Sequence, residues 1–259
     1  GNKVLSGEKM MIGALVCSIG AVICYMLCYH MTTERVKVEQ NTQKFSFKEL
    51  ISEIAHNKAL IGIIVCALLF LLAQLSLSNM NNYIYPNYFG NVSAMSLANL
   101  AGMVVILVLS TFIVKLSAKV GKKELSVIGS IISAAAFLIL FFIHTDNVWV
   151  WIVLVLISSV GTAMFNMVIW AMITDVIDDS EVRTGVRQDG TIYSVYSFAR
   201  KLGQACSSGI SGVLLSIIGY TAATAHDPKV VDGIYNVTCL VPALGMILLF
   251  LALQIFISS

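Results

Sequence analysis

Long apolar segments separated by short polar ones run along the whole chain and predict a series of membrane-spanning helices. Residues 10–29 and residues 59–114 contain no Asp, Glu, Lys or Arg. A helix rises about 1.5 Å per residue, so it needs roughly 20 mostly apolar residues to cross a hydrocarbon core of about 30 Å. The second segment is too long for one span, and the Asn-rich stretch 79–91, which contains Pro86 and Gly90, is expected to divide it.

Applied to the rest of the chain, the same criterion predicts an all-α integral membrane protein with seven spans. The predicted spans are residues 10–29, 59–78, 93–115, 125–144, 148–174, 191–220 and 237–258. The fifth span is longer than a membrane requires, so we expect it to tilt or to project beyond the bilayer.

Lysine and arginine are distributed unevenly between the predicted loops, and this sets the expected orientation. Eleven follow the first, third and fifth spans: Arg35, Lys37, Lys44, Lys48, Lys58, Lys115, Lys119, Lys122, Lys123, Arg183 and Arg187. Three lie on the opposite side: Lys3, Lys9 and Lys229. Because positive charge accumulates in cytoplasmic loops, we expect the front end of the chain outside the cell (inner or plasma) membrane and its last residues in the cytoplasm.

The connection over residues 31–58 is the longest and most polar of the predicted loops. Ser46 and Glu49 have the spacing of a helix-capping box, and Leu50 and Ile54 then share one face, which is typical of a short amphipathic helix on a membrane surface. A long cytoplasmic loop followed by six spans predicts a linker between two bundles. We therefore expect three regions: the last helix of an otherwise missing N-terminal bundle (1–30), a cytoplasmic inter-bundle loop (31–58) and a C-terminal six-helix bundle (59–259).

Composition supports a membrane protein and argues against soluble enzymes and nucleic-acid binders. Of the 259 residues, 58% are apolar or aromatic and 12% are charged, whereas a soluble domain has about 45–50% and about 25%. The net charge of +2 is too small to favour a nucleic-acid partner. The six cysteines all lie in apolar segments, and the sequence contains no catalytic or metal-binding motif. We therefore expect no enzyme and no cofactor.

The densest polar stretch covers residues 175–190, at the predicted cytoplasmic end of the fifth span. Asp175, Asp178 and Glu181 are spaced by three, so they share one face of a helix. Carboxylates at a helix C-terminus meet the negative end of its dipole, at a cost of about 0.3–1 kcal/mol each, unless nearby arginines compensate. Two interpretations remain open: a solvated loop of mixed charge, or an ionic latch that forms and breaks against another cytoplasmic loop.

Lys201 places a positive charge deep inside the sixth predicted span. If the helix begins near Thr191, Lys201 lies about 15 Å along it, near the middle of the membrane. A cation there costs about 2.5–3.5 kcal/mol or more, so it must face a bundle interior or a wet cavity. Arg200 points about 100° away, so we expect one of the pair to face a cavity and the other to reach the interface or a neighbouring helix. The alternative is a helix that starts later and keeps both at the interface.

Small and polar residues accompany Lys201 and extend into other spans. Small residues four apart, such as Gly203 and Ser207, allow another helix to approach closely. Tyr196 and Ser197 add hydrogen-bonding groups beside a polar cavity. The lone polar residues of other spans, Gln74 and Asn166, need partners inside the protein, and a purely structural role for them remains an equal alternative.

These polar residues form one long pattern. Its parts are Asp175-x-x-Asp178-x-x-Glu181, Thr184-Gly185-x-Arg187-x-Asp189-Gly190, Lys201-x-Gly203 and Gly219-Tyr220. The pattern resembles the glycoside–pentoside–hexuronide:cation symporters, the melibiose permease-like family of the major facilitator superfamily. The segments Tyr88-Phe89-Gly90-Asn91 and Gly121-Lys122-Lys123 also look like that family. Two departures are Asp189, where the family usually has glutamate, and Arg200 before the lysine.

The resemblance implies a major-facilitator fold of twelve helices in two six-helix halves, in which the first span here would be the sixth. It implies that a charge network closing the cytoplasmic side includes Asp175, Asp178, Glu181, Arg187 and Asp189. It also implies a substrate and cation cavity that includes Lys201, and we assign to the same cavity Tyr196, Ser197 and Asn166.

The expected function is cation-coupled symport of a sugar or glycoside by alternating access in a lipid bilayer. The coupling ion is Na⁺ or H⁺, and the resemblance implies that its carboxylate site lies in the missing N-terminal half, which is the expected protein partner. Two alternatives remain open: a major-facilitator transporter of a lysolipid, drug or organic anion, and a membrane sensor or scaffold that transports nothing.

Overall fold

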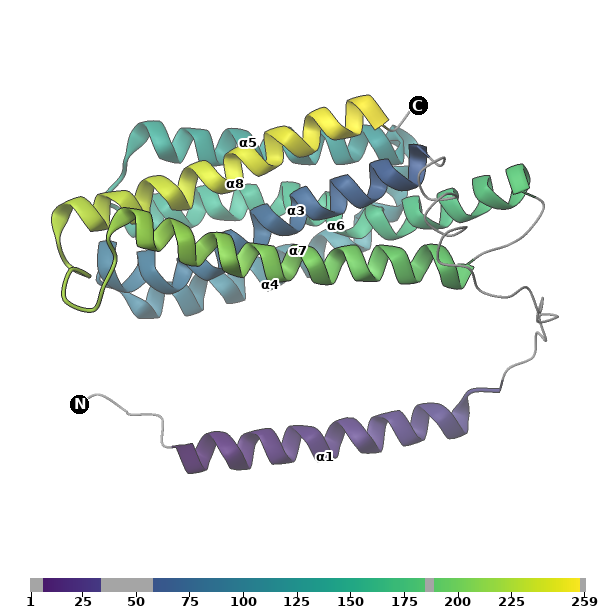
Figure 1. Cartoon of the computed structure of the whole chain (residues 1–259), viewed down its shortest axis with the longest axis horizontal. Helices are drawn as coiled ribbons and strands as arrows, with labels where there is room; N and C mark the ends of the chain where they lie inside the picture. Colours follow the sequence, from purple (N-terminus) through teal and green to yellow (C-terminus); the bar gives the residue numbers. More distant parts are fainter. Residues whose placement is uncertain (1–6, 34–57, 185–188, 257–259) are drawn as a thin grey trace. The chain divides into compact units, whose positions relative to one another are not determined.

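The computed structural model describes residues 7–33, 58–184 and 189–256, and every regular element within them is a helix (Figure 1). The chain divides into two units, Gly1–Ser46 and Phe47–Ser259, and the first contains α1 (Gly7–Met31). The second contains α3 (Lys58–Tyr83), the π-helical turn η1 (Ile84–Tyr88), α4 (Val92–Val120), α5 (Lys122–Ile143), α6 (Val148–Thr184), α7 (Asp189–Ile218) and α8 (Pro228–Phe256).

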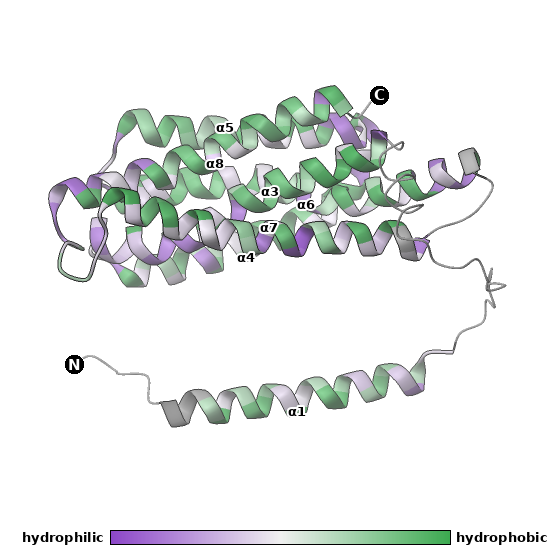
Figure 2. Ribbon diagram, in the orientation of Figure 1, coloured by the Kyte–Doolittle hydropathy of each residue, from purple (hydrophilic) through white to green (hydrophobic). Residues whose placement is uncertain are grey.

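Seven of the described helices are long and apolar enough to cross a membrane, which confirms the all-α fold class and the predicted number of spans. Figure 2 shows apolar residues along the length of each helix and hydrophilic residues mainly near the helix ends, with an interruption midway along α7. The surface helix predicted within residues 31–58 lies outside the described residues, as does Arg187.

The Asn-rich stretch divides the long apolar segment as expected, with the break at residues 89–91, but it is helical up to Tyr88, which corrects the predicted end of the second span at residue 78. α3 continues through this stretch and passes directly into η1. Asn79 donates from Nδ2 to the Ser211 hydroxyl of α7 at 3.2 Å, so its amide has a partner in a neighbouring helix. The wider turn of η1 accommodates Pro86, which has no N–H to donate.

Among the other helices, α6 and α8 extend furthest beyond their predicted spans. α6 runs ten residues past the predicted end at 174, and α8 begins nine residues before the predicted start at 237. Asp227 caps α8 because its carboxylate accepts a hydrogen bond from the backbone N–H of Lys229 at 3.0 Å. Pro228 takes the first helical position, where an N–H is not needed. Both extensions contain polar residues, so a criterion based on apolarity leaves them out although they are helical.

α5 and α6 pack with their backbones in contact. A Cβ added to Gly129 would lie 2.5 Å from the carbonyl oxygen of Gly161, so neither position has room for a side chain. Beside this contact, the buried hydroxyls of Ser133 and Ser158 form a hydrogen bond of 2.7 Å. Without a hydrophobic drive between helices in lipid, close packing and such hydrogen bonds hold them together.

α7 and α8 both pack on α3 through small residues. The Ser76 hydroxyl of α3 hydrogen-bonds the Ser207 hydroxyl of α7 at 3.2 Å, and both side chains are buried. A Cβ added to Gly245 of α8 would lie 2.7 Å from the Cβ of Ala73. The small residues of the sixth predicted span therefore serve, in part, to seat α7 against α3.

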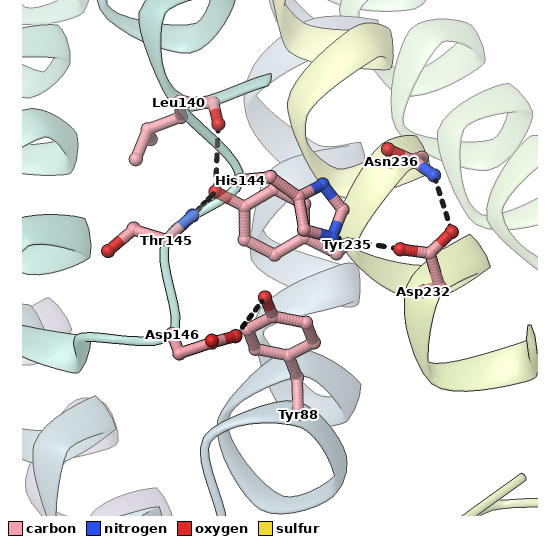
Figure 3. Close-up of polar contacts among 8 residues, drawn as sticks. All are labelled: Tyr88, Leu140, His144, Thr145, Asp146, Asp232, Tyr235 and Asn236. Carbon is pink, nitrogen blue, oxygen red and sulfur yellow. Dashed lines mark hydrogen bonds and ion pairs between the residues drawn. The ribbon is translucent and has the colours of Figure 1, made fainter. Parts of the chain in front are cut away.

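An aromatic cluster joins η1, the α5–α6 connection and the beginning of α8 (Figure 3). The Tyr235 hydroxyl donates to the carbonyl oxygen of Leu140 at 2.8 Å and accepts from the backbone N–H of Thr145 at 3.1 Å. The ring of His144 stacks on Tyr235 with a centroid distance of 4.3 Å, and its Nε2 lies 2.8 Å from Asp232 Oδ1. Tyr235 thereby satisfies the C-terminal end of α5 with a group from α8.

A second contact of the aromatic cluster comes from η1. The Tyr88 hydroxyl donates to Asp146 Oδ1 at 2.9 Å, and its ring centroid lies 4.7 Å from that of Tyr235. Three parts of the chain that are distant in sequence therefore meet at this end of the bundle. His144 is exposed and is one of the residues that connect them.

We expect Gly161→Ala to destabilise the protein by about 1–3 kcal/mol, because the added methyl group forces α5 and α6 apart. The measurement is the melting temperature of the purified protein in detergent. Gly209→Ala is the matched control, since nothing lies within 4 Å of a Cβ added there. An unchanged melting temperature for Gly161→Ala would contradict the backbone contact.

Replacing Tyr235 with phenylalanine keeps the stacked ring and removes the hydroxyl. We expect a loss of about 1–3 kcal/mol, because the Leu140 carbonyl and the Thr145 N–H lose their shared partner. Thermal unfolding in detergent measures this loss, and Tyr193→Phe on the exposed side of α7 is the control. Equal stability of the two variants would show that the aromatic cluster does not hold this end together.

Candidate functional site

Arg200 and Lys201, the adjacent cations of α7, have different surroundings. α7 begins two residues before its predicted start, which excludes a late start, and the cations lie eleven and twelve residues after its first residue. The Arg200 guanidinium lies 5.2 Å from the ring centroid of Trp170 on α6 and donates to the Tyr196 hydroxyl at 3.3 Å. Lys201 is exposed, and its Nζ donates to Gln204 Oε1 at 3.3 Å. Arg200 is therefore held against a neighbouring helix, whereas the ammonium group of Lys201 is exposed on the surface of the bundle.

The other residues assigned to the cavity differ in their burial. Tyr196 is 1% exposed and belongs to the apolar core, where its hydroxyl accepts the hydrogen bond of Arg200. Ser197 of α7 and Asn166 of α6 are half-buried. Tyr196 thus positions Arg200 from within the core, and a role in solute binding for Lys201, Ser197 and Asn166 stays a prediction.

Asp175, the first carboxylate of the predicted gate, is paired within the bundle. Lys122 at the start of α5 donates from Nζ to both of its carboxylate oxygens, at 2.6 and 2.7 Å. The side chains are 39% and 57% exposed, so the ion pair lies at the surface. α6 continues nine residues past Asp175, so this carboxylate does not lie in the last turn and the expected dipole penalty does not apply to it.

The remaining gate residues lie on either side of the α6–α7 connection. Asp178 and Glu181 belong to the last turns of α6, the first exposed and the second half-buried. Asp189 lies in the first turn of α7, where the helix dipole favours a negative charge. The acidic residues of the predicted gate therefore gather near one end of the bundle, the end that also holds the Lys122–Asp175 ion pair.

A cavity of about 340 Å³ lies between α3, η1, α4, α5, α6 and α8, and α7 contributes no residue to its lining. Nine of its nineteen lining residues carry a polar side-chain group and none is charged: Gln74, Ser78, Asn81, Tyr85, Asn99, Ser133, Ser158, Ser159 and Thr162. Ser133 and Ser158 are buried, whereas Ser78 and Asn99 are exposed. The cavity therefore has its floor at α5 and α6 and opens between α3 and α4.

Of this polar lining, only Gln74 was predicted from the sequence to need a partner inside the protein. The available signal was the phase of the polar residues on α3, because Gln74, Ser78 and Asn81 are spaced by four and three and so share one helix face. The lining consists of neutral donors and acceptors. Among the described residues there is no group of three or more His, Cys, Asp or Glu that could hold a metal ion.

Known proteins match this chain over almost its whole length. Residues 3–258 match the family model for MFS/sugar transport protein. The uncharacterized symporter YjmB of Bacillus subtilis (strain 168) is 31% identical over 228 residues, which cover 88% of this chain and 50% of that protein. The glucuronide carrier protein homolog of Escherichia coli (strain K12) is 28% identical, with coverages of 93% and 53%. The isoprimeverose transporter of Lactiplantibacillus pentosus is 24% identical, with coverages of 99% and 53%.

The chain spans about half the length of the curated relatives it matches. The family match agrees with the seven apolar helices and confirms the resemblance seen in the polar motifs. Its members are transport proteins and not enzymes. The chain therefore belongs to the MFS/sugar transport protein family and is a multi-pass membrane transport protein.

Proposed function

We propose that the chain is part of a transporter in the cell membrane that moves a sugar or glycoside together with Na⁺ or H⁺ by alternating access. The observation that carries the proposal is Lys201, an exposed cation midway along a membrane-spanning helix with no carboxylate partner among the described residues. A cation at such a depth costs about 2.5–3.5 kcal/mol unless it meets water, solute or an opposite charge. The relatives named as a glucuronide carrier homolog and an isoprimeverose transporter support a sugar as the solute.

We infer that a second helical bundle faces the side of α7 that carries Lys201. Ala205, Ser208 and Gly212 follow Lys201 at helical spacing, and all three are exposed small residues that permit close approach of another helix. The relatives, which are about twice as long as this chain, support such a bundle. In this arrangement the facing bundle is the N-terminal one, and α1 is its last helix. Carboxylates of the N-terminal bundle bind the coupling cation.

In this mechanism Lys201 links the cation to the sugar through its charge. When the cation is absent, the ammonium group neutralises the carboxylates of the facing bundle. When the cation binds to these carboxylates, it displaces the Lys201 ammonium group from them. The space between the two bundles can then accept the solute. The same charge balance lets the empty and the fully loaded carrier reorient with less unpaired charge in the membrane than a carrier that holds only one of its ligands.

The charged end of the bundle is proposed to be the cytoplasmic gate. Lysines at the ends of α4 and α5 support a cytoplasmic position for this end. Asp178, Glu181, Arg187 and Asp189 then form the latch against the other bundle. The Lys122–Asp175 ion pair has a different role, because both partners belong to this bundle. It holds α5 on α6 and so supports the end of α6 that carries Asp178 and Glu181.

We expect Lys201→Gln in the intact transporter to separate sugar movement from the cation gradient. Uptake driven by an inward Na⁺ or H⁺ gradient is abolished, whereas exchange of internal for external sugar continues, because the solute site remains and the coupling charge is lost. The measurement is uptake and exchange of a radiolabelled sugar in proteoliposomes, and Lys229→Gln at the start of α8 is the control.

Normal gradient-driven uptake by Lys201→Gln would refute its role in coupling. The wild-type transporter is assayed with a panel of neutral and acidic sugars, a lysolipid and an organic anion. Uptake of the lysolipid or anion without uptake of any sugar would replace the proposed solute with the alternative class. Absence of all uptake, with the protein folded and correctly inserted, would contradict transport.

Lys122→Glu places two negative charges opposite each other at the α5–α6 contact. We expect it to lower the transport rate about two- to fivefold, because an exposed ion pair contributes up to about 1 kcal/mol. The charge-swapped double variant Lys122→Glu/Asp175→Lys restores the rate, and Lys123→Glu alone leaves it unchanged. Equal rates for Lys122→Glu and Lys123→Glu would show that the pair does not support the gate.

A further inference from the structure

We propose that the cavity between α3 and α4 binds the uncharged, hydroxylated part of the transported solute. This proposal rests on the proposed sugar transport and adds a site that is separate from Lys201. No residue of α7 lines the cavity, so its amides meet the solute independently of the coupling charge.

Three carboxamides face this cavity and form no hydrogen bond with any described residue: Gln74, Asn81 and Asn99. The Asn81 Oδ1 atom is buried and has no hydrogen-bond partner among the described residues. A buried polar group without a partner costs about 1–3 kcal/mol. Within the lining the Ser133 and Ser158 hydroxyls bond each other, and on the α3–α7 contact Ser76 bonds Ser207, whereas the three carboxamides stay open to a ligand.

The chemistry of the lining favours a sugar over a lipid chain or an ion. Each carboxamide offers both a donor and an acceptor, as does each hydroxyl of a sugar, so adjacent pairs match. The apolar residues of the lining, Leu77, Phe137 and Met246 among them, provide a surface for the C–H face of a ring. An acyl chain would leave the amides unpaired, and the absence of charged lining residues gives a bare ion no counter-charge.

The dimensions of the cavity also fit a small organic ligand. Its volume of about 340 Å³ falls within the range of about 300–1,000 Å³ typical of small-molecule sites. One water occupies only about 30 Å³, so a single ordered water cannot satisfy the site. The exposed residues Ser78 and Asn99 mark its mouth, and Asn81 is part of the lining.

The test compares Asn81→Leu with Asn82→Leu in the intact transporter. The two substitutions remove the same amide from adjacent positions of α3, but Asn82 is exposed, bonds the Ser78 carbonyl and does not line the cavity. We expect Asn81→Leu to raise the half-saturation concentration for sugar uptake about three- to tenfold, the loss of one or two hydrogen bonds. Asn82→Leu leaves it within twofold of the wild type. The probes are radiolabelled isoprimeverose and 4-nitrophenyl β-D-glucuronide. The variants are assayed with the probe that the wild type transports.

Asn99→Leu provides a second variant whose folding is not at risk, because its side chain is exposed at the mouth. It is expected to raise the half-saturation concentration as well, while melting temperature and dependence on the cation gradient stay unchanged. Wild-type half-saturation for both Asn81→Leu and Asn99→Leu, with sugar transport intact, would overturn the cavity proposal and leave the proposed function standing. Lack of uptake of every sugar by the wild type would instead overturn the function on which the proposal rests.

Discussion

A bilayer offers no hydrogen bonds to the polar groups that it surrounds, and this constraint governs how the helices of the second unit are held together. Ser133 on α5 meets Ser158 on α6, and Ser76 on α3 meets Ser207 on α7, in each case with both side chains buried. The pairing fixes which faces of the helices touch. Glycines at the same seams then bring the backbones together, so that hydrogen bonding and close packing specify one arrangement.

The two ends of the bundle are closed by different means. At one end the Lys122–Asp175 ion pair ties α5 to α6, and at the other Tyr235 and the rest of the aromatic cluster tie α8 to the α5–α6 connection (Figure 3). Between these ends are the groups that lack ordinary partners, namely the exposed charge of Lys201 and the amides of the α3–α4 cavity. Such an arrangement, with both ends of the bundle held together and open polar groups between them, suits a protein whose polar groups bind solutes and ions.

Apolarity predicted the number of helices, but it did not predict where several of them end. Apolarity indicates which residues are immersed in lipid, not which residues form a helix. Polar extensions of helices were therefore assigned to loops, namely the Asn-rich end of α3, the acidic end of α6 and the capped start of α8. The expectation that Arg200 and Lys201 diverge was correct, because helix geometry alone requires it, whereas the partner of Arg200, Trp170, depends on the packing of α6 against α7. The cavity was not predicted as a site, since it requires the relative register of five helices, although the shared face of Gln74, Ser78 and Asn81 pointed to part of it.

In this transporter the polar groups left without protein partners are the ones proposed to meet the solute. An experimental structure of the intact transporter with a transported sugar bound tests this proposal most directly. We expect sugar hydroxyls within about 3.2 Å of the amides of Asn81 and Asn99. A bound sugar that contacts neither amide, in a cavity filled by water or by side chains, would contradict it.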